Sequence, residues 1–338
     1  MGVSVKEVAQ RAGVSVGTVS NVLNRPGSVR AETIERVQAA IADLGYVPND
    51  AARQLRAGQS TQIALVVLDM GNPFFTDVAR GAEEQAALSG HTLLLANSDE
   101  SPDREALHLD QFERQRVAGV LLVPTADAAE RVDRLRERGI PVVLVDRGAS
   151  DRSVASVAVD DVAGGRMAAQ HLLDQGRRTL VFVGGPAMLD QVRDRLLGAQ
   201  DAVGSVPGAS LEVVPTSGLT LDEGVAAGER VRALVDVGEC DAVFTGNDLL
   251  AIGVQQALLS GPQPMKIPDD VAMVGYDDIS FAAAAVVPIT SVRQPRADMG
   301  STAVELLLKE RDLAPDAPRE HVVFQPELAV RRSSGASA

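Results

Sequence analysis

A change in hydrophobic periodicity near residue 61 places the strongest constraint on the fold of this chain. After that point, short apolar runs alternate with amphipathic segments of roughly 12–16 residues, a pattern typical of βαβ units on parallel sheets. The apolar runs are nearly continuous, so we expect helices to cover both faces of each sheet. Because about 270 residues exceed one ordinary core, we predict two similar subdomains. The predicted strands are 63–68, 92–96, 120–123, 141–145, 179–183, 211–214, 242–244 and 271–274.

Residues 1–45 show helical periodicity instead. Ser4 followed by Glu7 is a capping box that predicts the start of a first helix, and Gly13 is expected to end it. Ser15 then caps a second helix that runs to about Leu23. A third helix is predicted from near residue 31 to the glycine at position 45.

The first two of these helices have the features of a helix-turn-helix. That motif needs a small residue where the helices cross, a turn residue that adopts positive φ, and apolar residues beneath the second helix. Ala9, Gly13 and Val19 meet these needs at suitable separations. Because a helix-turn-helix places its second helix in the DNA major groove, the motif predicts DNA binding. An ordinary αα-hairpin is the alternative interpretation of this segment.

The charge distribution agrees with nucleic-acid binding by the N-terminal part. The chain of 338 residues carries a net charge of −14, but residues 1–60 hold seven Lys or Arg against five Asp or Glu, and the remainder carries −16. The sequence has no apolar run of about 18 residues and no signal-peptide core, and Cys240 is its single cysteine. We therefore expect a cytoplasmic protein without membrane contact.

Motifs in a fixed order along the chain indicate a family. Residues 5–24, VKEVAQRAGVSVGTVSNVLN, closely resemble the headpiece of the lac repressor (LacI/GalR) family. The resemblance implies a DNA-binding transcriptional regulator, and specifically a repressor. It continues in collinear order to about residue 330, through LGYVPN at 44–49, ARQL at 52–55, NPFF at 72–75, GND at 246–248, VGYDD at 274–278 and QP at 294–295.

The resemblance also implies a domain organisation. We expect an N-terminal helix-turn-helix headpiece of three helices at 1–46, with a hinge helix and linker at 47–60. An α/β body of the periplasmic-binding-protein type, with two parallel-sheet subdomains, should follow at 61–332 and carry effector binding and dimerisation. The expected lobes are an N-lobe of about 61–158 plus 296–320 and a C-lobe of about 159–292 plus 321–332.

The family headpiece nominates DNA-contacting residues. Val16, Gly17 and Asn21 stand where relatives read base edges, since Asn21 can bond an adenine edge and Val16 can pack on a thymine methyl. Gly17 has no side chain and Asn21 replaces the arginine common there, so the operator sequence stays open. Leu55 matches a residue that wedges between base pairs, although a buried linker leucine is the alternative. The other expected contacts, to phosphates or from the hinge, are Ser15, Thr18, Ser20, Asn24, Asn49, Ala52 and Arg53.

A ligand site is expected in the body, independently of the resemblance. Open α/β sheets bind ligands at the carboxyl ends of their strands. Polar residues follow several predicted strands directly, namely Asp69, Asn97, Asp146, Asn247 and Asp277.

The resemblance names the effector contacts more closely. Arg195 with Asp277 would be the usual pair for ligand hydroxyls or a carboxylate, although an ion pair of Arg195 with Asp190 or Asp194 on its own helix is the alternative. Phe74 is equally open to a core role. Leu219 stands where relatives often place an aromatic that covers the ligand, so few residues of this chain could stack on a sugar face. A sugar remains the favoured ligand, with nucleosides and small organic acids as alternatives. The full nominated set is Phe74, Asp146, Gln191, Arg195, Asn247, Asp277 and Gln294.

Catalysis, metal binding and cofactors are not expected. The histidines at 91, 108, 171 and 321 lack metal-ligand spacing, and the glycines at 184–185 lack the rest of a P-loop. Gly164 and Gly165 are interpreted as helix-packing residues. A periplasmic solute-binding protein would share the body but need an export signal and lack the headpiece. The expected partners are pseudo-palindromic operator DNA, a second copy of the chain and a small effector, with a protein corepressor as the alternative to the effector.

Overall fold

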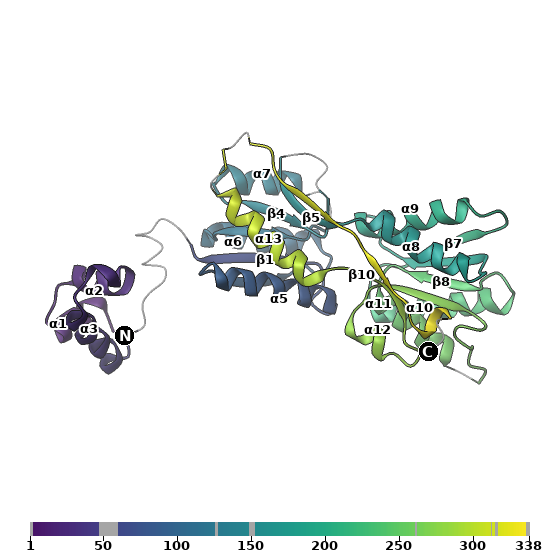
Figure 1. Cartoon of the computed structure of the whole chain (residues 1–338), viewed down its shortest axis with the longest axis horizontal. Coiled ribbons are helices and arrows are strands. Elements are labelled where there is room, and N and C mark those ends of the chain that lie inside the picture. Colours follow the sequence, from purple (N-terminus) through teal and green to yellow (C-terminus); the bar gives the residue numbers. More distant parts are fainter. Residues whose placement is uncertain are drawn as a thin grey trace. The chain divides into compact units, whose positions relative to one another are not determined.

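The computed structural model describes residues 3–46, 60–125, 128–148, 153–260, 262–311, 313–314 and 317–335. The chain divides into two compact units, Met1–Ser60 and Thr61–Ala338 (Figure 1). We call the first the headpiece and the second the body.

The headpiece consists of helices α1 (Val5–Ala12), α2 (Val16–Asn24) and α3 (Ala31–Leu44), with a short 3-10 turn at Pro26–Ser28. The predicted helices are confirmed. Ser4 and Glu7 form the capping box, and Gly13 ends α1 at φ 66°. The helices share a small core of Val8, Ala9, Ala12, Val19, Val22, Val37 and Ala40.

The body contains two six-stranded sheets. Strand pairs are parallel except for β10 with β12, which is antiparallel. The first sheet has the order β11-β5-β4-β3-β1-β2, with β1 Gln62–Val67, β2 Thr92–Asn97, β3 Gly119–Leu122, β4 Val142–Val145, β5 Ala155–Val159 and β11 His321–Phe324. The second has the order β12-β10-β9-β8-β6-β7, with β6 Thr179–Gly184, β7 Ser210–Pro215, β8 Ala242–Thr245, β9 Ala272–Asp277, β10 Thr290–Arg293 and β12 Glu327–Ala329.

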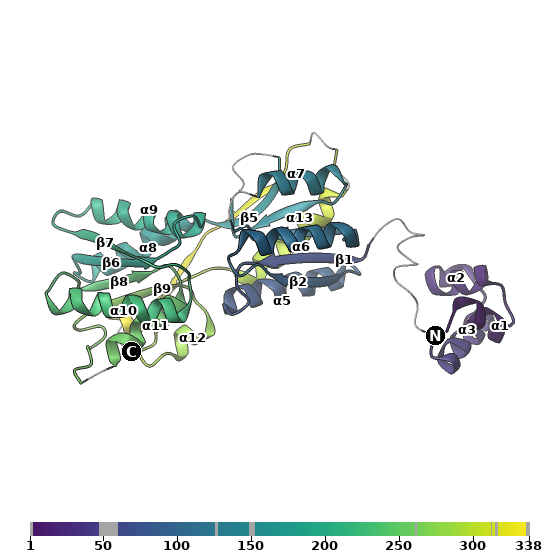
Figure 2. The ribbon, with the colours of Figure 1, turned by 180° about the vertical axis from the view of Figure 1, so that it is seen from behind.

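Helices cover both faces of each sheet, as expected for buried parallel strands. On the first sheet, α5 (Pro73–Leu88) and α13 (Arg296–Glu310) lie on one face, and α6 (Pro102–Gln115) and α7 (Ala129–Glu137) lie on the other (Figures 1 and 2). On the second sheet, α8 (Asp161–Asp174) and α9 (Asp190–Gly204) are opposite α10 (Leu221–Asp236) and α11 (Asp248–Leu259). The short α12 spans Ser280–Ala284. Each sheet with its helices is one lobe, and the chain passes between lobes at 160, 294–295 and 325–326.

Glycines bring pairs of these helices into backbone contact. A Cβ at Gly165 of α8 would lie 1.9 Å from the carbonyl oxygen of Arg195 on α9, and one at Gly300 of α13 would lie 2.0 Å from that of Val78 on α5. The predicted packing role of Gly165 is therefore confirmed, and Gly164 also packs closely, since a Cβ there would lie 2.1 Å from the hydroxyl oxygen of Tyr276 on β9. Because no side chain separates the paired backbones, α8 with α9 and α5 with α13 form close-packed units.

The structure corrects one expected lobe boundary. Residues 321–332 were expected in the C-lobe, but β11 pairs in parallel with β5 and so completes the edge of the first sheet. The chain enters the second lobe only after Phe324, where β12 pairs with β10. All the predicted strands are present, within one to three residues at each end, while β5, β10, β11 and β12 were not predicted.

The described residues that follow Arg332 pack into the second lobe. Ser333 and Ser334 are fully buried in the second lobe. The Ser333 hydroxyl donates to the carbonyl of Met273 at 2.6 Å, and the Ser334 hydroxyl lies 2.7 Å from Nε2 of His171.

Candidate functional site

The carboxyl ends of strands from both lobes meet at a buried polar cluster. Its members come from strand ends and helix starts: Asn72 caps α5, Asp146 follows β4, Asp161 begins α8, Asn247 caps α11 and Asp277 ends β9. Each is at most 8% exposed. Buried polar groups are costly unless they form hydrogen bonds, so the partners of each of these side chains matter. We call the following residues the interlobe cluster: Asn72, Asp146, Asp161, Gln191, Arg195, Asn247, Asp277 and Gln294.

Arg195 is the cation of this cluster. Its Nε donates to Asp161 Oδ1 at 2.8 Å, and its Nη1 donates to the carbonyl of Gly246 at 2.7 Å. The guanidinium lies over the ring of Tyr276, 3.8 Å from its centroid, and Asp277 Oδ1 is 3.9 Å from Nη1. Burial alone would lower the pKa of Arg195, but the surrounding carboxylates, chiefly Asp161, raise it above its ordinary value. Arg195 therefore stays charged, and the alternative pairing with carboxylates of its own helix is wrong.

Asp277 connects the lobes. Its carboxylate accepts from Nδ2 of Asn72 at 3.1 Å and from Nε2 of Gln294 at 2.8 Å. Its φ of 98° is uncommon for a residue other than glycine, and such a conformation costs about 1–3 kcal/mol. Burial raises the pKa of Asp277, while Arg195 opposes that shift.

Asp146 faces the second lobe from the first. Nε2 of Gln191 on α9 donates to its Oδ2 at 3.4 Å. Burial raises the pKa of Asp146 well above its ordinary value, and the charge of Asp161 adds to that effect. Among the described residues, its other oxygen Oδ1, Gln294 Oε1 and Thr216 Oγ1 are buried without a hydrogen-bond partner. Two of these three atoms accept hydrogen bonds only.

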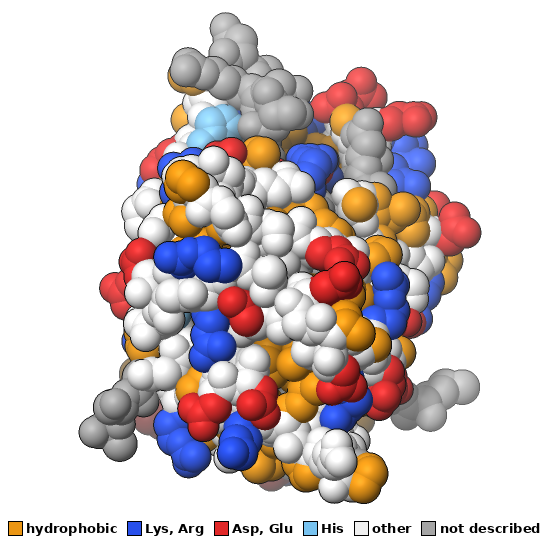
Figure 3. Space-filling view, turned by 90° about the vertical axis from the view of Figure 1, so that its right-hand side faces the viewer, with side chains coloured by type: hydrophobic (Ala, Val, Ile, Leu, Met, Phe, Trp, Pro, Cys, Tyr) orange, Lys and Arg blue, Asp and Glu red, His pale blue; other side chains and the backbone are white. Residues whose placement is uncertain are grey.

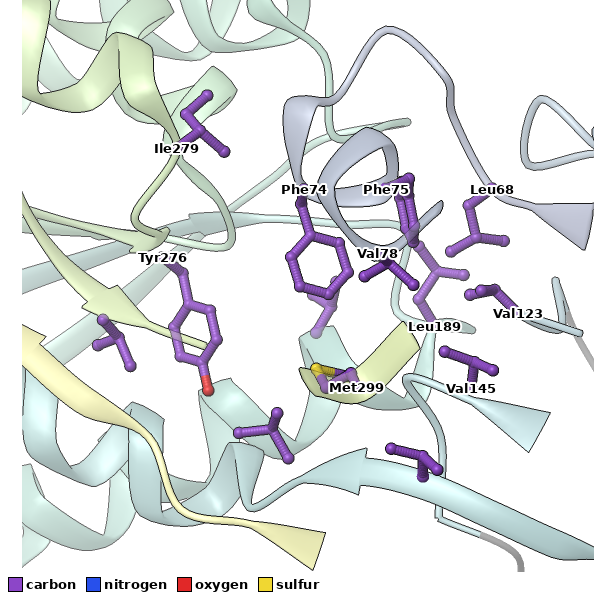
Figure 4. Close-up of a cluster of buried hydrophobic side chains, with 14 of the residues drawn as sticks. Leu68, Phe74, Phe75, Val78, Val123, Val145, Leu189, Tyr276, Ile279 and Met299 are labelled. Atoms are coloured by element: carbon purple, nitrogen blue, oxygen red, sulfur yellow. The ribbon is translucent and has the colours of Figure 1, made fainter. Parts of the chain in front are cut away.

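An aromatic wall borders the cluster. Phe74 is 2% exposed and packs edge-on against Phe75, with ring centroids 5.0 Å apart. Figure 4 shows its ring between Tyr276 on one side and Val78 on the other. The structure therefore places Phe74 in the apolar core that joins the lobes.

Asn247 is held by its neighbours. Its Oδ1 accepts from the backbone of Leu250 at 2.9 Å, which caps α11, and its Nδ2 donates to the carbonyl of Leu219 at 2.9 Å. It fixes the loop that carries Leu219 beside the cluster.

In the headpiece, α2 presents an exposed face. Gly17 and Asn21 are exposed and Val16 is half-buried, while Val19 and Val22 are turned into the core. Ser15 caps α2, since its hydroxyl accepts from the backbone of Thr18 at 3.1 Å. Thr18 and Ser20 are half-buried on the same helix. Of the side chain of Asn24 nothing is described, and Asn49, Ala52, Arg53 and Leu55 lie outside the described residues.

Comparisons with known proteins agree with this architecture. Residues 4–49 match the family model for bacterial regulatory proteins of the lacI family, and residues 169–334 match a periplasmic binding protein-like domain. The ribose operon repressor of Bacillus subtilis (strain 168) is 34% identical over 97% of this chain and 99% of its own length. The chain belongs to the LacI family. The resemblance inferred from the sequence and the expected fold class are thereby confirmed, and the protein is a DNA-binding transcriptional regulator.

Solved structures of LacI-family proteins share the fold. A regulator from Enterococcus faecium with bound ribose has a TM-score of 0.72 at 27% identity, covering 80% of this chain and 98% of that one. The lac repressor dimer bound to operator and the anti-inducer ONPF has a TM-score of 0.85 at 23% identity, covering 99% and 100%. Among the described helices of this LacI-family chain, none combines the length and hydropathy needed to span a bilayer.

Among the nominated effector residues of this LacI-family body, Asp146 contacts Gln191, and Asp277 contacts Arg195 and Gln294. Asn247 instead bonds to Leu219 and Leu250, and Phe74 lies in the apolar core. Other members of the interlobe cluster were not predicted. Asp161 was missed because it follows β5, a strand that was not predicted. Asn72 was missed although its place before Pro73 is typical of a helix cap. Tyr276 lies inside the recognised VGYDD motif, but its contact with Arg195 depends on the pairing of distant elements.

Proposed function

We propose that this regulator is a repressor that binds a pseudo-palindromic operator as a homodimer and that a sugar bound between the lobes controls its affinity for DNA. Two related proteins support this proposal. The relative from Bacillus subtilis is named a ribose operon repressor, and the solved structure of the Enterococcus faecium regulator contains bound ribose. We take ribose as the first sugar to test.

The hydrogen-bonding character of the interlobe cluster carries the ligand proposal. Asp146 Oδ1 and Gln294 Oε1 are buried acceptors without partners in the described part of the chain. Three carboxyl groups, on Asp146, Asp161 and Asp277, lie around the guanidinium of Arg195. A cluster rich in hydrogen-bond acceptors favours a neutral molecule with several hydroxyl donors. It disfavours the organic acids that the sequence had left open, because a carboxylate ligand adds further acceptors and no donors.

The DNA-binding role is assigned to the headpiece. On the face of the body seen in Figure 3, Lys and Arg side chains are interspersed with Asp and Glu, and residues 61–338 account for the acidic balance of the chain. We propose that Val16, Gly17 and Asn21 face base edges and that Ser15, Thr18, Ser20 and Asn24 contact phosphates. Contacts from Asn49, Ala52 and Arg53 and the wedge role of Leu55 remain part of the proposal.

The proposed control is a population shift. A ligand that bonds residues of both lobes favours one arrangement of the lobes, and it can change operator affinity only by its difference in affinity for the two arrangements. A few kcal/mol of such difference is enough for regulation. We propose no catalytic role, and we assign the protein to the cytoplasm, where its operator would lie.

The proposal is tested by thermal shift followed by operator titration. The purified protein is scanned with D-ribose, other pentoses and hexoses, nucleosides and small organic acids. Ligand at about 100 times its Kd should stabilise the folded chain by roughly 2.7 kcal/mol. Stabilisation by a sugar that also changes operator affinity supports the proposal. Stabilisation by acids alone, or a sugar response without any change in operator affinity, contradicts it.

A further inference from the structure

Arg296 contacts both lobes from a position outside the nominated effector set. It is the first residue of α13, directly after the chain has crossed from the second lobe at 294–295. Its Nη1 donates to the carbonyl oxygens of Asp277 at 2.6 Å and Asp278 at 2.5 Å, at the end of β9. Its Nε lies 3.2 Å from Oδ2 of Asp77 on α5. One side chain thus joins the second lobe to two helices of the first.

The turn that Arg296 holds is a strained one. Asp277 and Asp278 have φ values of 98° and 52°. Residues other than glycine adopt such values only when the surrounding structure enforces them. Ser291 supports the turn by accepting from the backbone of Asp278 at 2.9 Å, and the Asp278 carboxylate pairs with Arg331 at 2.6 Å. This conformation directs the Asp277 carboxylate toward the interlobe cluster.

The Asp277–Asp278 turn also contacts α5 directly, in addition to its contact through Arg296. Asn72, the cap of α5, donates to Asp277 Oδ2 at 3.1 Å, and Asp77 lies one and a half turns further along that helix. Helix α5 is in turn in backbone contact with α13, where a Cβ at Gly81 would lie 2.0 Å from the carbonyl oxygen of Ala297. Arg296, Asp77, Asn72 and Asp277 therefore form a closed ring of contacts between rigid elements.

We propose that Arg296 is a positioning residue that fixes the Asp277–Asp278 turn against α5 and thereby sets the arrangement of the lobes in which the effector binds. Its part in effector binding rests on the proposed function. Its part in lobe arrangement does not, because the contacts are made between protein groups alone.

The guanidinium is suited to this task because it presents donors in several directions at once. Arg296→Lys would keep the positive charge, but a single ammonium group could not reach the two carbonyl oxygens and the Asp77 carboxylate that the planar guanidinium contacts together. Exchange of the two charges, by Asp77→Arg together with Arg296→Asp, would restore an ion pair and still leave the carbonyls of the turn without their donor. These variants separate the positioning role from simple charge attraction.

The first test measures the distance between lobes in the full-length protein. Spin labels are attached at Glu137→Cys on α7 and Glu229→Cys on α10, both exposed positions. Cys240 is 3% exposed and burial raises the pKa of its thiol to about 12, so it should not compete for label. Arg296→Gln should lengthen and broaden the distance distribution. Arg80→Gln, which removes an exposed arginine 3.9 Å from Asp77, should leave it unchanged. An unchanged distribution in Arg296→Gln overturns the proposal.

The second test uses D-ribose as the probe in calorimetric titrations. Arg296→Gln should raise the Kd about 10- to 100-fold, the range expected for lost hydrogen bonds to charged groups. The charge-exchanged pair should not recover wild-type affinity, and full recovery would reduce the role of Arg296 to an ion pair and overturn the proposal. An unchanged or lower Kd in Arg296→Gln would also overturn the proposal. If the wild type does not bind ribose, the proposed ligand is wrong, and the distance measurement still decides on Arg296.

Discussion

The side-chain amide of Asn72 forms hydrogen bonds in both lobes. Its Oδ1 accepts from the backbone of Phe74 at 3.0 Å, and its Nδ2 donates to Asp277 Oδ2 at 3.1 Å. The first bond caps α5 in the first lobe, and the second reaches the end of β9. A change at the interlobe cluster therefore acts directly on the start of α5.

Asn72→Asp should separate these two functions. Aspartate is as good a helix cap as asparagine, so α5 keeps its start, but the donor to Asp277 is replaced by a like charge. We expect the free energy of unfolding of the body to fall by about 1–3 kcal/mol, measured by urea titration at pH 7.5. Asn72→Ser, which provides an uncharged cap, should lower the free energy of unfolding by less. Equal losses in both variants would mean that like-charge contact with Asp277 does not contribute.

Arg195→Ala should be strongly destabilising and should abolish the ligand response. It leaves Asp161 and Asp277 buried without their cation, and removal of one partner from a buried pair typically costs about 3–5 kcal/mol. The matched control is Arg166→Ala on α8, because Arg166 and Asp201 form an ion pair of equal length, 2.8 Å, with both side chains about half exposed. That variant should lose less than about 1 kcal/mol. Similar losses for the two arginines would contradict the assignment of Arg195 as the central cation.

Glycine-to-alanine changes in the headpiece should have opposite signs at two nearby positions. A Cβ at Gly17 would meet Ser15 Oγ at 3.6 Å, an ordinary contact, so Gly17→Ala should stabilise α2 by up to about 1 kcal/mol. Gly13 has φ 66°, where a Cβ costs about 1–2 kcal/mol. Hydrogen exchange of the α2 amides in the full-length protein, without DNA, measures both effects. Faster exchange in Gly17→Ala would contradict the first expectation.

The burial of His171 should make stability depend on pH. Burial lowers the pKa of His171 below its ordinary value of 6.5, with Asp174 opposing. The unfolded chain therefore takes up the proton first, and the contribution of this group, fully present above pH 6.5, is lost as the pH falls below that value through the lowered pKa of the folded state. The loss of unfolding free energy between pH 7.5 and 5.5 should be smaller in His171→Gln than in the wild type. An unchanged loss in His171→Gln would refute the assignment.

Local sequence patterns predicted the helices and central strands better than they predicted which strands pair with one another. The capping box at Ser4 and the apolar runs of the central strands follow from short stretches of sequence, and both were found as expected. The strands that were missed, β5, β10, β11 and β12, have three to five residues each, and β11 and β12 are half exposed at sheet edges. Their identity depends on pairing with distant strands, so periodicity alone does not reveal them.

The same limit applies to the site. The positions of Asp146, Asn247 and Asp277 after strands correctly indicated which edge of the sheets would carry polar residues. The partner of Arg195 could not be found by proximity in sequence, because the neighbouring Asp190 and Asp194 are on its own helix and Asp161 is brought in by the packing of α8 on α9. That packing depends on Gly165 and Gly198, whose backbones meet the opposite helix.

The passage of the chain between lobes at 325–326 has a consequence for biosynthesis and for fragment design. The first sheet is incomplete until β11 has been made, and the second lacks an edge until β12 follows. Neither lobe can therefore reach its final structure on the ribosome before almost the whole body has emerged, and cutting the gene at a single point cannot yield one complete lobe. Variants in which the separated segments of one lobe are fused through a linker, with the segments of the other lobe deleted, would be the route to isolating either half.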